Sequence, residues 1–229
     1  MPRQTLDREI HHLQDEVLLL GSMVEQAILN AIDALKRRDL EAARRVYNDD
    51  DLINEKRYAI ENRALILFAT QQPIAHDLRL LAAMLEVITE LERMGDYAKG
   101  IAKINRLIGS DDTPIPIREI SRMGDLAVGM LHRALSAFIA EDVDMAYRIP
   151  KEDDQVDDLY NQIYHKLVDN MIADPDVIDH ANYIMWVVHN IERTADRVTN
   201  ICERTIFIAT GELLEIDASD DEWAEAGER

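Results

Sequence analysis

The chain has 229 residues, of which 47% are hydrophobic and 5% aromatic, with 8 glycines and 6 prolines. This composition allows one large domain or two small ones, and it favours helices over a β-rich fold, which needs more turn residues and aromatic strands. The net charge of −20, from 45 acidic and 25 basic residues, repels phosphate backbones and anionic lipids, so nucleic acid is excluded as a favoured partner.

The chain also lacks the usual signs of export. Cys202 is the single cysteine, so no disulfide can form within the chain, which suits a reducing compartment, and we expect this thiol to be buried and inert. Residues 1–9 lack the apolar core of a signal peptide. The longest apolar stretches, 80–85 and 183–188, are far shorter than the roughly 20 residues of a membrane helix. We therefore expect a cytoplasmic protein without direct membrane insertion.

Apolar residues at spacings of three and four predict three long helices in the first half. They span about residues 5–36, 40–70 and 74–108, and Asp39 is the expected N-cap of the second. Residues 109–116, which include Gly109, Pro114 and Pro116, give the strongest loop signal of the chain. The boundary between two halves is expected there.

The second half repeats this scheme. A helix is predicted over 117–140, another from an Asp142 cap to about Ile172 with a kink at Pro150, and a third over 176–210 ending at Gly211. The expected domains are 1–110 and 114–216, each a three-helix bundle, followed by an acidic disordered tail over 217–229. The predicted fold class is therefore all-α, with two tandem three-helix bundles related by an internal repeat.

The repeat is visible in the letters of the sequence. Shifting the third helix by about 100 positions lays Glu-Arg-Met-Gly-Asp at 92–96 on Glu-Arg-Thr-Ala-Asp at 192–196. A similar shift lays Asp50 and Asn54 of the second helix on Asp153 and Asp157 of the fifth. Each half thus presents the same acidic pattern at equivalent places.

These repeated carboxylates are candidate metal ligands. A Glu and an Asp four residues apart lie on one side of a helix and repel each other, so their double occurrence beside an apolar seam suggests a compensating cation at the edge of each bundle. Four or more carboxylate oxygens from two helices suit a hard ion such as Mg²⁺, Mn²⁺, Ca²⁺ or iron better than zinc. The candidate ligands are Asp50, Glu92, Asp96, Asp153, Glu192 and Asp196.

Two other interpretations stay open from the residues alone. Arg93 and Arg193 could pair with the carboxylates and leave a metal-free helical adapter. A carboxylate-bridged metalloenzyme is the third interpretation, and Glu9 with His12 has the spacing found in di-iron bundles. Such bundles need a second Glu-x-x-His, which the sequence lacks, and no glycine-rich phosphate loop is present. We therefore expect a binding protein rather than an enzyme.

At this point the chain resembles the PhoU family. The segments QPIAHDLR at 72–79 and ELERMGD at 90–96 resemble the first repeat of that family, and NIERTADR at 190–197 with NICE at 200–203 resembles the second. GSMVE at 21–25 resembles the first-helix signature. The likeness covers about residues 5–210, nearly the whole chain.

The resemblance implies a negative regulator of the phosphate-starvation response and of phosphate uptake. Family members are thought to link the ATPase of the ABC-type phosphate transporter to a sensor histidine kinase, usually as homodimers. The family's E/DxxxD motifs bind metal in some members, which implies iron, Mn or Mg at the six carboxylates named above. The chain departs from the family pattern at Ala195, where the family has Gly, and at Pro150.

Overall fold

The structure is a computed structural model that describes residues 2–109 and 115–216, with side chains described from residue 4 onward. The predicted boundary region around 110–114 and the predicted acidic tail at 217–229 lie outside the described residues. Within the described part every regular element is helical. The long helices are α1 (Pro2–Arg37), α2 (Leu40–Gln71), α3 (His76–Ile108), α4 (Ile117–Ala140), α6 (Asp153–Ala173) and α7 (Ile178–Thr210).

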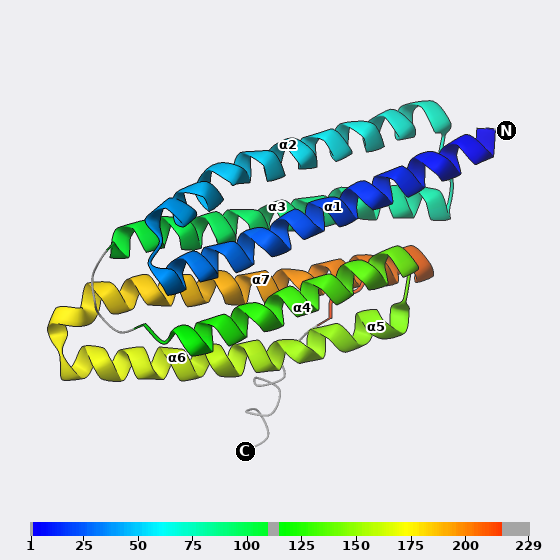
Figure 1. Ribbon diagram of the computed structural model, residues 1–229. Helices are drawn as coiled ribbons and strands as arrows, with labels where there is room; N and C mark the ends of the chain where they lie inside the picture. Colours follow the sequence, from blue (N-terminus) through cyan, green and yellow to red (C-terminus); the bar gives the residue numbers. More distant parts are fainter. Residues whose placement is uncertain (1, 110–114, 217–229) are drawn as a thin grey trace, which may run out of the picture.

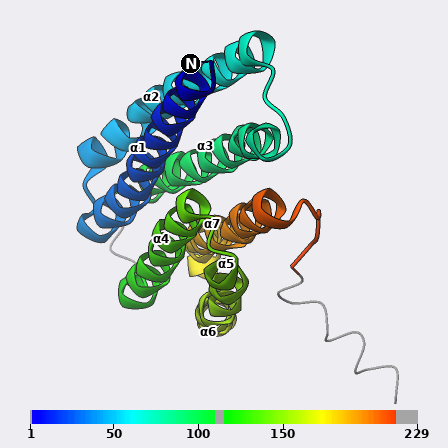
Figure 2. The same cartoon turned by 90° about the vertical axis from the view of Figure 1, so that its right-hand side faces the viewer.

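The two halves form two three-helix bundles stacked on each other, as Figure 1 and the end-on view of Figure 2 show. Helices α1, α2 and α3 make the first bundle. Helices α4 and α7, with α5 (Val143–Arg148) and α6, make the second. The bundles meet where α3 packs on α7 and α1 packs on α4. The predicted all-α fold with an internal repeat is therefore confirmed.

Proline divides the second helix of the second bundle, as predicted. Between α5 and α6 the chain forms a short 3₁₀ helix, Ile149–Glu152, with Pro150 in its first turn. Proline lacks the N–H that an α-helix interior needs, so the backbone tightens there and the two α-helical pieces continue on either side. Pro175 likewise opens a short 3₁₀ turn, Pro175–Val177, before α7.

The helix ends are set by residues that the sequence identified. Asp39 accepts a hydrogen bond from the backbone N–H of Ala42 at the start of α2, and Asp142 accepts one from that of Met145 at the start of α5. Gly211 ends α7 with a positive φ of 82°, which glycine adopts without a steric penalty. Short polar caps thus fix where the chain turns between antiparallel helices.

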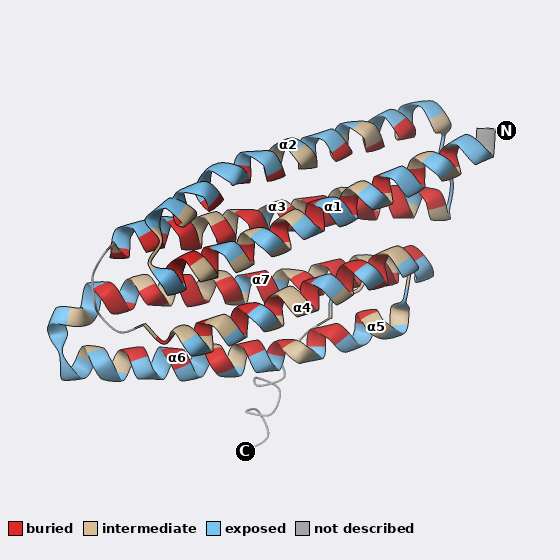
Figure 3. Ribbon diagram, viewed as in Figure 1, coloured by how far each residue is buried: buried red, intermediate tan, exposed pale blue. Residues whose placement is uncertain are grey.

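The core is continuous across both bundles, as the buried positions in Figure 3 show. Of the described helices, α1 alone has a length and composition, over residues 4–37, that would allow it to cross a membrane. Core helices of water-soluble proteins meet the same criterion. The apolar stripe of α1, which includes Leu13, Val17 and Leu20, is fully buried within this fold.

Candidate functional site

Each repeat places its predicted acidic residues on its second and third helices. Across the two helices, Asp50 acts on Asp96 in the first repeat, and the carboxyl groups act on one another in the second. In the first bundle, Asp50 lies on α2, while Glu92 and Asp96 lie on α3. Asp50 is buried, and its Oδ1 lies 3.5 Å from the place where a Cβ on Gly95 would stand. A Cβ there would stand 3.1 and 3.2 Å from two side-chain carbons of Ile53, so the missing side chain of Gly95 lets Ile53 of α2 pack closely on α3, and Asp50 lies on the same helix at ordinary contact distance.

The first cluster already contains a cation from the protein itself. Lys99 Nζ donates a hydrogen bond of 2.7 Å to Asp50 Oδ2, and the amide of Asn54 donates one of 3.1 Å to the same oxygen. The hydrogen bond with Asp50 raises the pKa of Lys99, which keeps its ammonium charged. Burial, and then the charge of Asp50, raises the pKa of Asp96.

The second cluster has four carboxylates. Asp153 and Asp157 lie on α6, and Glu192 and Asp196 lie on α7. Asp153 is 5% exposed, and its Oδ1 is buried without a hydrogen-bond partner among the described residues. A buried carboxylate oxygen without a donor carries a desolvation cost that a bound cation would offset.

Burial and mutual repulsion dominate the electrostatics of this cluster. Burial, followed by the charges of Asp157, Asp196 and Glu192, raises the pKa of Asp153 to about 7. Burial, followed by Asp196 and Asp157, raises the pKa of Glu192 to about 7 as well. Because these carboxyl groups affect one another's pKa values, they form one coupled acidic site, in which Asp153 is buried and Asp196 is exposed.

The nearby basic side chains compensate the second cluster only in part. His189 Nδ1 lies 3.2 Å from Glu192 Oε2, although the two atoms do not have hydrogen-bond geometry. Arg193, which the metal-free interpretation paired with carboxylates, lies over the ring of Tyr97 with its guanidinium carbon 5.5 Å from the ring centroid. It still lowers the pKa values of Glu192 and Asp196, but more weakly than burial raises them.

The types of ligand in the second cluster suit a metal ion, but the present arrangement of the side chains does not. The second cluster has hard oxygen donors and an orphaned buried carboxylate oxygen, which fit Mg²⁺, Mn²⁺ or iron. As the side chains stand, however, no group of three or more His, Cys, Asp or Glu residues in the described part of the chain is arranged to hold an ion. Binding would therefore need the carboxylates of α6 and α7 to turn toward one another.

Two features of the site were not among the predicted ligands. Lys99 pairs with Asp50, and Asp157 belongs to the second cluster although only Asp153 was chosen from its helix. Helix spacing could have indicated both residues. Lys99 lies three residues after Asp96 and Asp157 lies four residues after Asp153, so each shares a helix face with a predicted ligand. The aspartates of the second helices are also more buried than a position at the bundle edge implies, with Asp50 only 3% exposed.

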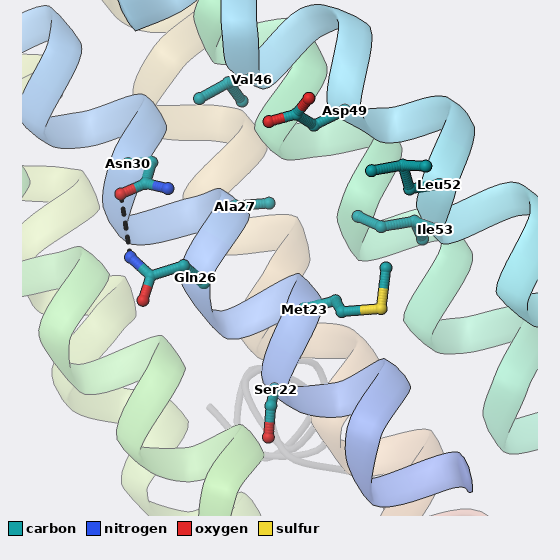
Figure 4. A pocket seen from close by; sticks show the side chains of 9 residues that line it. All are labelled: Ser22, Met23, Gln26, Ala27, Asn30, Val46, Asp49, Leu52 and Ile53. Carbon is teal, nitrogen blue, oxygen red and sulfur yellow. Dashed lines mark hydrogen bonds between the residues drawn. The ribbon is translucent and has the colours of Figure 1, made fainter.

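A separate groove of about 420 Å³ opens between α1 and α2. Figure 4 shows Met23 and Ala27 of α1 facing Leu52 and Ile53 of α2 across it. Its polar residues include Gln26, whose amide donates a hydrogen bond of 2.8 Å to Asn30. The groove is mainly apolar and does not include the six predicted ligands.

Fold and site together define a class of protein: an all-helical, two-repeat protein with one acidic cluster per repeat, each built around a buried aspartate. The PhoU domain family matches residues 6–104 and 120–205, one match in each bundle. The chain belongs to the PhoU family.

Named relatives and solved structures agree with this assignment. The chain is 36% identical over 219 residues to the phosphate-specific transport system accessory protein PhoU homolog of Clostridium acetobutylicum, covering 95% of this chain and 100% of that protein. It is 37% identical over 208 residues to the homolog of Caulobacter vibrioides, covering 90% of each chain.

The crystal structure of the phosphate transport system regulatory protein PhoU from Streptococcus pneumoniae superposes with a TM-score of 0.86 at 31% identity, over 92% of this chain and 100% of that one. PhoU from Pseudomonas aeruginosa superposes with a TM-score of 0.84 at 30% identity, over 90% of this chain and 99% of that one.

Proposed function

We propose that this protein is a cytoplasmic negative regulator of phosphate uptake and of the phosphate-starvation response. The observation that carries the proposal is similarity over nearly the full length, at 36% identity, to a protein named as an accessory of the phosphate-specific transport system. The similarity to a solved structure named as a phosphate transport system regulatory protein supports the same role. On this proposal the protein acts by binding rather than by catalysis.

The proposed partners are the ATPase of the phosphate ABC transporter and a sensor histidine kinase. When phosphate is plentiful, the protein would contact both and hold the kinase in its inactive or phosphatase state. The long helices favour such a role, because they offer extended exposed faces on either bundle. The proposed solution state is a homodimer.

Metal binding is proposed as part of this function, with iron, Mn or Mg held by the acidic clusters. The observation that supports it is the buried, unpartnered Oδ1 of Asp153 among four coupled carboxylates. The metalloenzyme alternative is not favoured. Glu9, which had the di-iron spacing with His12, instead accepts a hydrogen bond of 2.7 Å from Arg63.

Deletion of the gene in its native host tests the regulatory role. Phosphate-starvation genes should be expressed constitutively in rich phosphate, and a plasmid copy of the chain should restore repression. Unchanged expression in rich phosphate after deletion would contradict the proposal.

A second experiment tests the partners. A tagged chain should retain the transporter ATPase and the sensor kinase on affinity resin from cells grown in high phosphate, and it should retain less of the kinase from starved cells. Recovery of neither protein under either condition would remove the adapter role. Sedimentation of the purified chain tests the homodimer.

A further inference from the structure

The two repeats put different side chains at equivalent places around their acidic clusters. Position 99 on α3 corresponds to position 199 on α7 by the shift of 100 residues that aligns the Glu-Arg-x-x-Asp motifs, and it holds Lys in the first repeat but Thr in the second. Asn54 on α2 corresponds to Asp157 on α6 by the shift that aligns Asp50 with Asp153. The second cluster therefore gains a carboxylate and loses an ammonium.

In the first repeat the ammonium of Lys99 is bound to Asp50, the carboxylate that corresponds to Asp153 of the second repeat. Lys99 Nζ lies 2.7 Å from Asp50 Oδ2 and 5.1 Å from the centre of the Tyr47 ring. Asp50 is 3% exposed and Lys99 has a side-chain exposure of 27%, so the pair is largely screened from solvent. A metal ion would have to displace a charge-assisted hydrogen bond from a buried carboxylate, which is costly because the ammonium would lose its partner.

In the second repeat Thr199 stands at the position equivalent to Lys99. Thr199 is 8% exposed, and neither its Oγ1 nor Asp153 Oδ1 has a hydrogen-bond partner among the described residues. Both atoms are oxygen acceptors that suit a hard cation. The unpartnered Oδ1 of Asp153, on a side chain that is 5% exposed, is an observation separate from the number of acids that a ligand belongs there, and Thr199 lies one helical turn after Asp196 on the same helix.

Formal charge gives the same contrast. The first cluster combines three carboxylates with the Lys99 ammonium and the Arg93 guanidinium, which lies 3.8 Å from both Glu92 and Asp96. The second combines four carboxylates with the Arg193 guanidinium and has Thr199 where the ammonium would be. Since like charges at close range repel, the second cluster has more to gain from a bound cation.

We propose that Lys99 is the built-in cation of the first repeat, and that only the second cluster, which has Thr199 at the equivalent position, takes a hard metal ion. This inference rests on the metal binding proposed above and deepens it, because it names the residue pair that decides which repeat binds. It predicts one site per chain rather than two.

The test measures Mn²⁺ binding to the purified full-length chain by isothermal titration calorimetry, after removal of metal with a chelator. The wild-type chain should bind at one site, and Asp153→Asn with Glu192→Gln should abolish that site. Glu92→Gln with Asp96→Asn, the matched change in the first repeat, should leave binding within about twofold of wild type. Equal loss from the two pairs, or two equal sites in the wild type, would overturn the inference.

Exchange of the residues at positions 99 and 199 tests whether the lysine prevents metal binding. Thr199→Lys places an ammonium in the second cluster and should weaken Mn²⁺ binding at least tenfold. Lys99→Thr with Asn54→Asp makes the first cluster a copy of the second and should add a second site. If Lys99→Thr with Asn54→Asp lowers stability so far that the chain does not fold, Thr199→Lys and the two amide pairs described above decide, because the amide replacements of Asp and Glu keep the size of the side chains. Unchanged affinity in Thr199→Lys contradicts the inference.

Absence of Mn²⁺ binding by the wild-type chain would also overturn this inference. It would leave the regulatory role standing, since that role is judged by expression of phosphate-starvation genes and not by metal content. The two proposals can therefore fail separately.

Discussion

At the scale of single residues, the second acidic cluster carries a cost in stability, because it sets carboxyl groups around a buried one. Asp153 is buried beside three other carboxyl groups, and its pKa rises from an ordinary 3.8 to about 7. A carboxyl group whose pKa is higher in the folded state binds more protons there than in the unfolded chain. Its contribution to the free energy of unfolding is therefore present at low pH and is lost as the pH rises through about 7.

The first prediction follows from this loss of stability with rising pH. Without metal, the melting temperature of the wild-type chain should fall as the pH rises from about 5 to about 8. Asp153→Asn removes one of the two carboxyl groups whose pKa rises to about 7, so the melting temperature of this variant should change less over the same range and should exceed that of the wild type at about pH 8. Thermal melts followed by circular dichroism in the presence of a chelator measure both. Parallel pH profiles for the two proteins would contradict the assignment.

Cys202 gives a second prediction at this scale. Burial raises the pKa of its thiol to about 12, and the side chain has no exposed surface. Because the thiolate is the reactive form, iodoacetamide at about pH 8 should leave the folded chain unmodified and should alkylate it fully in denaturant. Mass spectrometry of the intact protein reads the result. Rapid modification of the folded chain would show that α7 opens locally at this position.

The six candidate ligands could be named from the sequence, but Lys99, Asp157 and the contacts around the ligands were missed. Repetition of the acidic motif marked Glu192 and Asp196 because the same spacing recurs in both halves. Pairing of Lys99 with Asp50 depends on how α2 and α3 are rotated against each other, which periodicity within one helix does not determine. For the same reason the sequence alone does not show that Asp153 Oδ1 is buried without a hydrogen-bond partner.

At the scale of elements, glycines set how closely the two bundles approach each other. A Cβ on Gly21 of α1 would collide with Leu135 of α4, and one on Gly124 of α4 would collide with Ile32 of α1. Each helix thus accepts a large side chain of the other into the space over its own glycine. The surfaces of α1 and α4 are therefore complementary in shape where they meet.

The third prediction compares two glycines of α4. Gly124→Leu should destabilise the chain by about 1–3 kcal/mol, because the added side chain competes with Ile32 for a filled space. Gly129→Leu on the same helix should be neutral or stabilising, since a Cβ there meets only the guanidinium of Arg133 at 3.5 Å and leucine favours the helix. Urea unfolding of the two variants measures the difference, and equal effects would contradict the packing argument.

The sequence predicted where the helices begin and end better than it predicted which side chains meet between helices. The fourth helix was predicted over 117–140 and is observed as Ile117–Ala140, because a strong apolar stripe and a proline define its start. Helix α7 begins two residues later than predicted, since Pro175 favours a 3₁₀ turn first. The match of Gly21 to Leu135 joins residues far apart in the chain, and no local pattern shows it.

At the scale of the whole molecule, polar contacts add to the apolar packing between the bundles. Arg197 of α7 donates hydrogen bonds of 2.7 Å to Glu90 and 2.9 Å to the hydroxyl of Tyr97, both on α3. Arg79 of α3 donates one of 3.0 Å to the backbone oxygen of Ile208 on α7. These contacts come from partly buried side chains, where charge-assisted hydrogen bonds count for more than on the open surface. The two repeats should therefore unfold together.

The last prediction tests that coupling with Arg197→Met. The variant keeps an apolar stem but leaves Glu90, whose side chain is 17% exposed, without its guanidinium, so stability should fall by about 1–3 kcal/mol. Arg37→Met, which breaks an exposed ion pair with Asp33 within α1, should cost at most about 0.5 kcal/mol and serves as the control. Hydrogen exchange followed by mass spectrometry measures the free energy of opening of the most protected amides in α3 and in α7. In Arg197→Met this free energy should fall by the same amount in both helices, since both bundles depend on one interface. A loss confined to α7 would mean that the repeats are stable independently, and the acidic clusters of the two bundles would then respond to their surroundings separately.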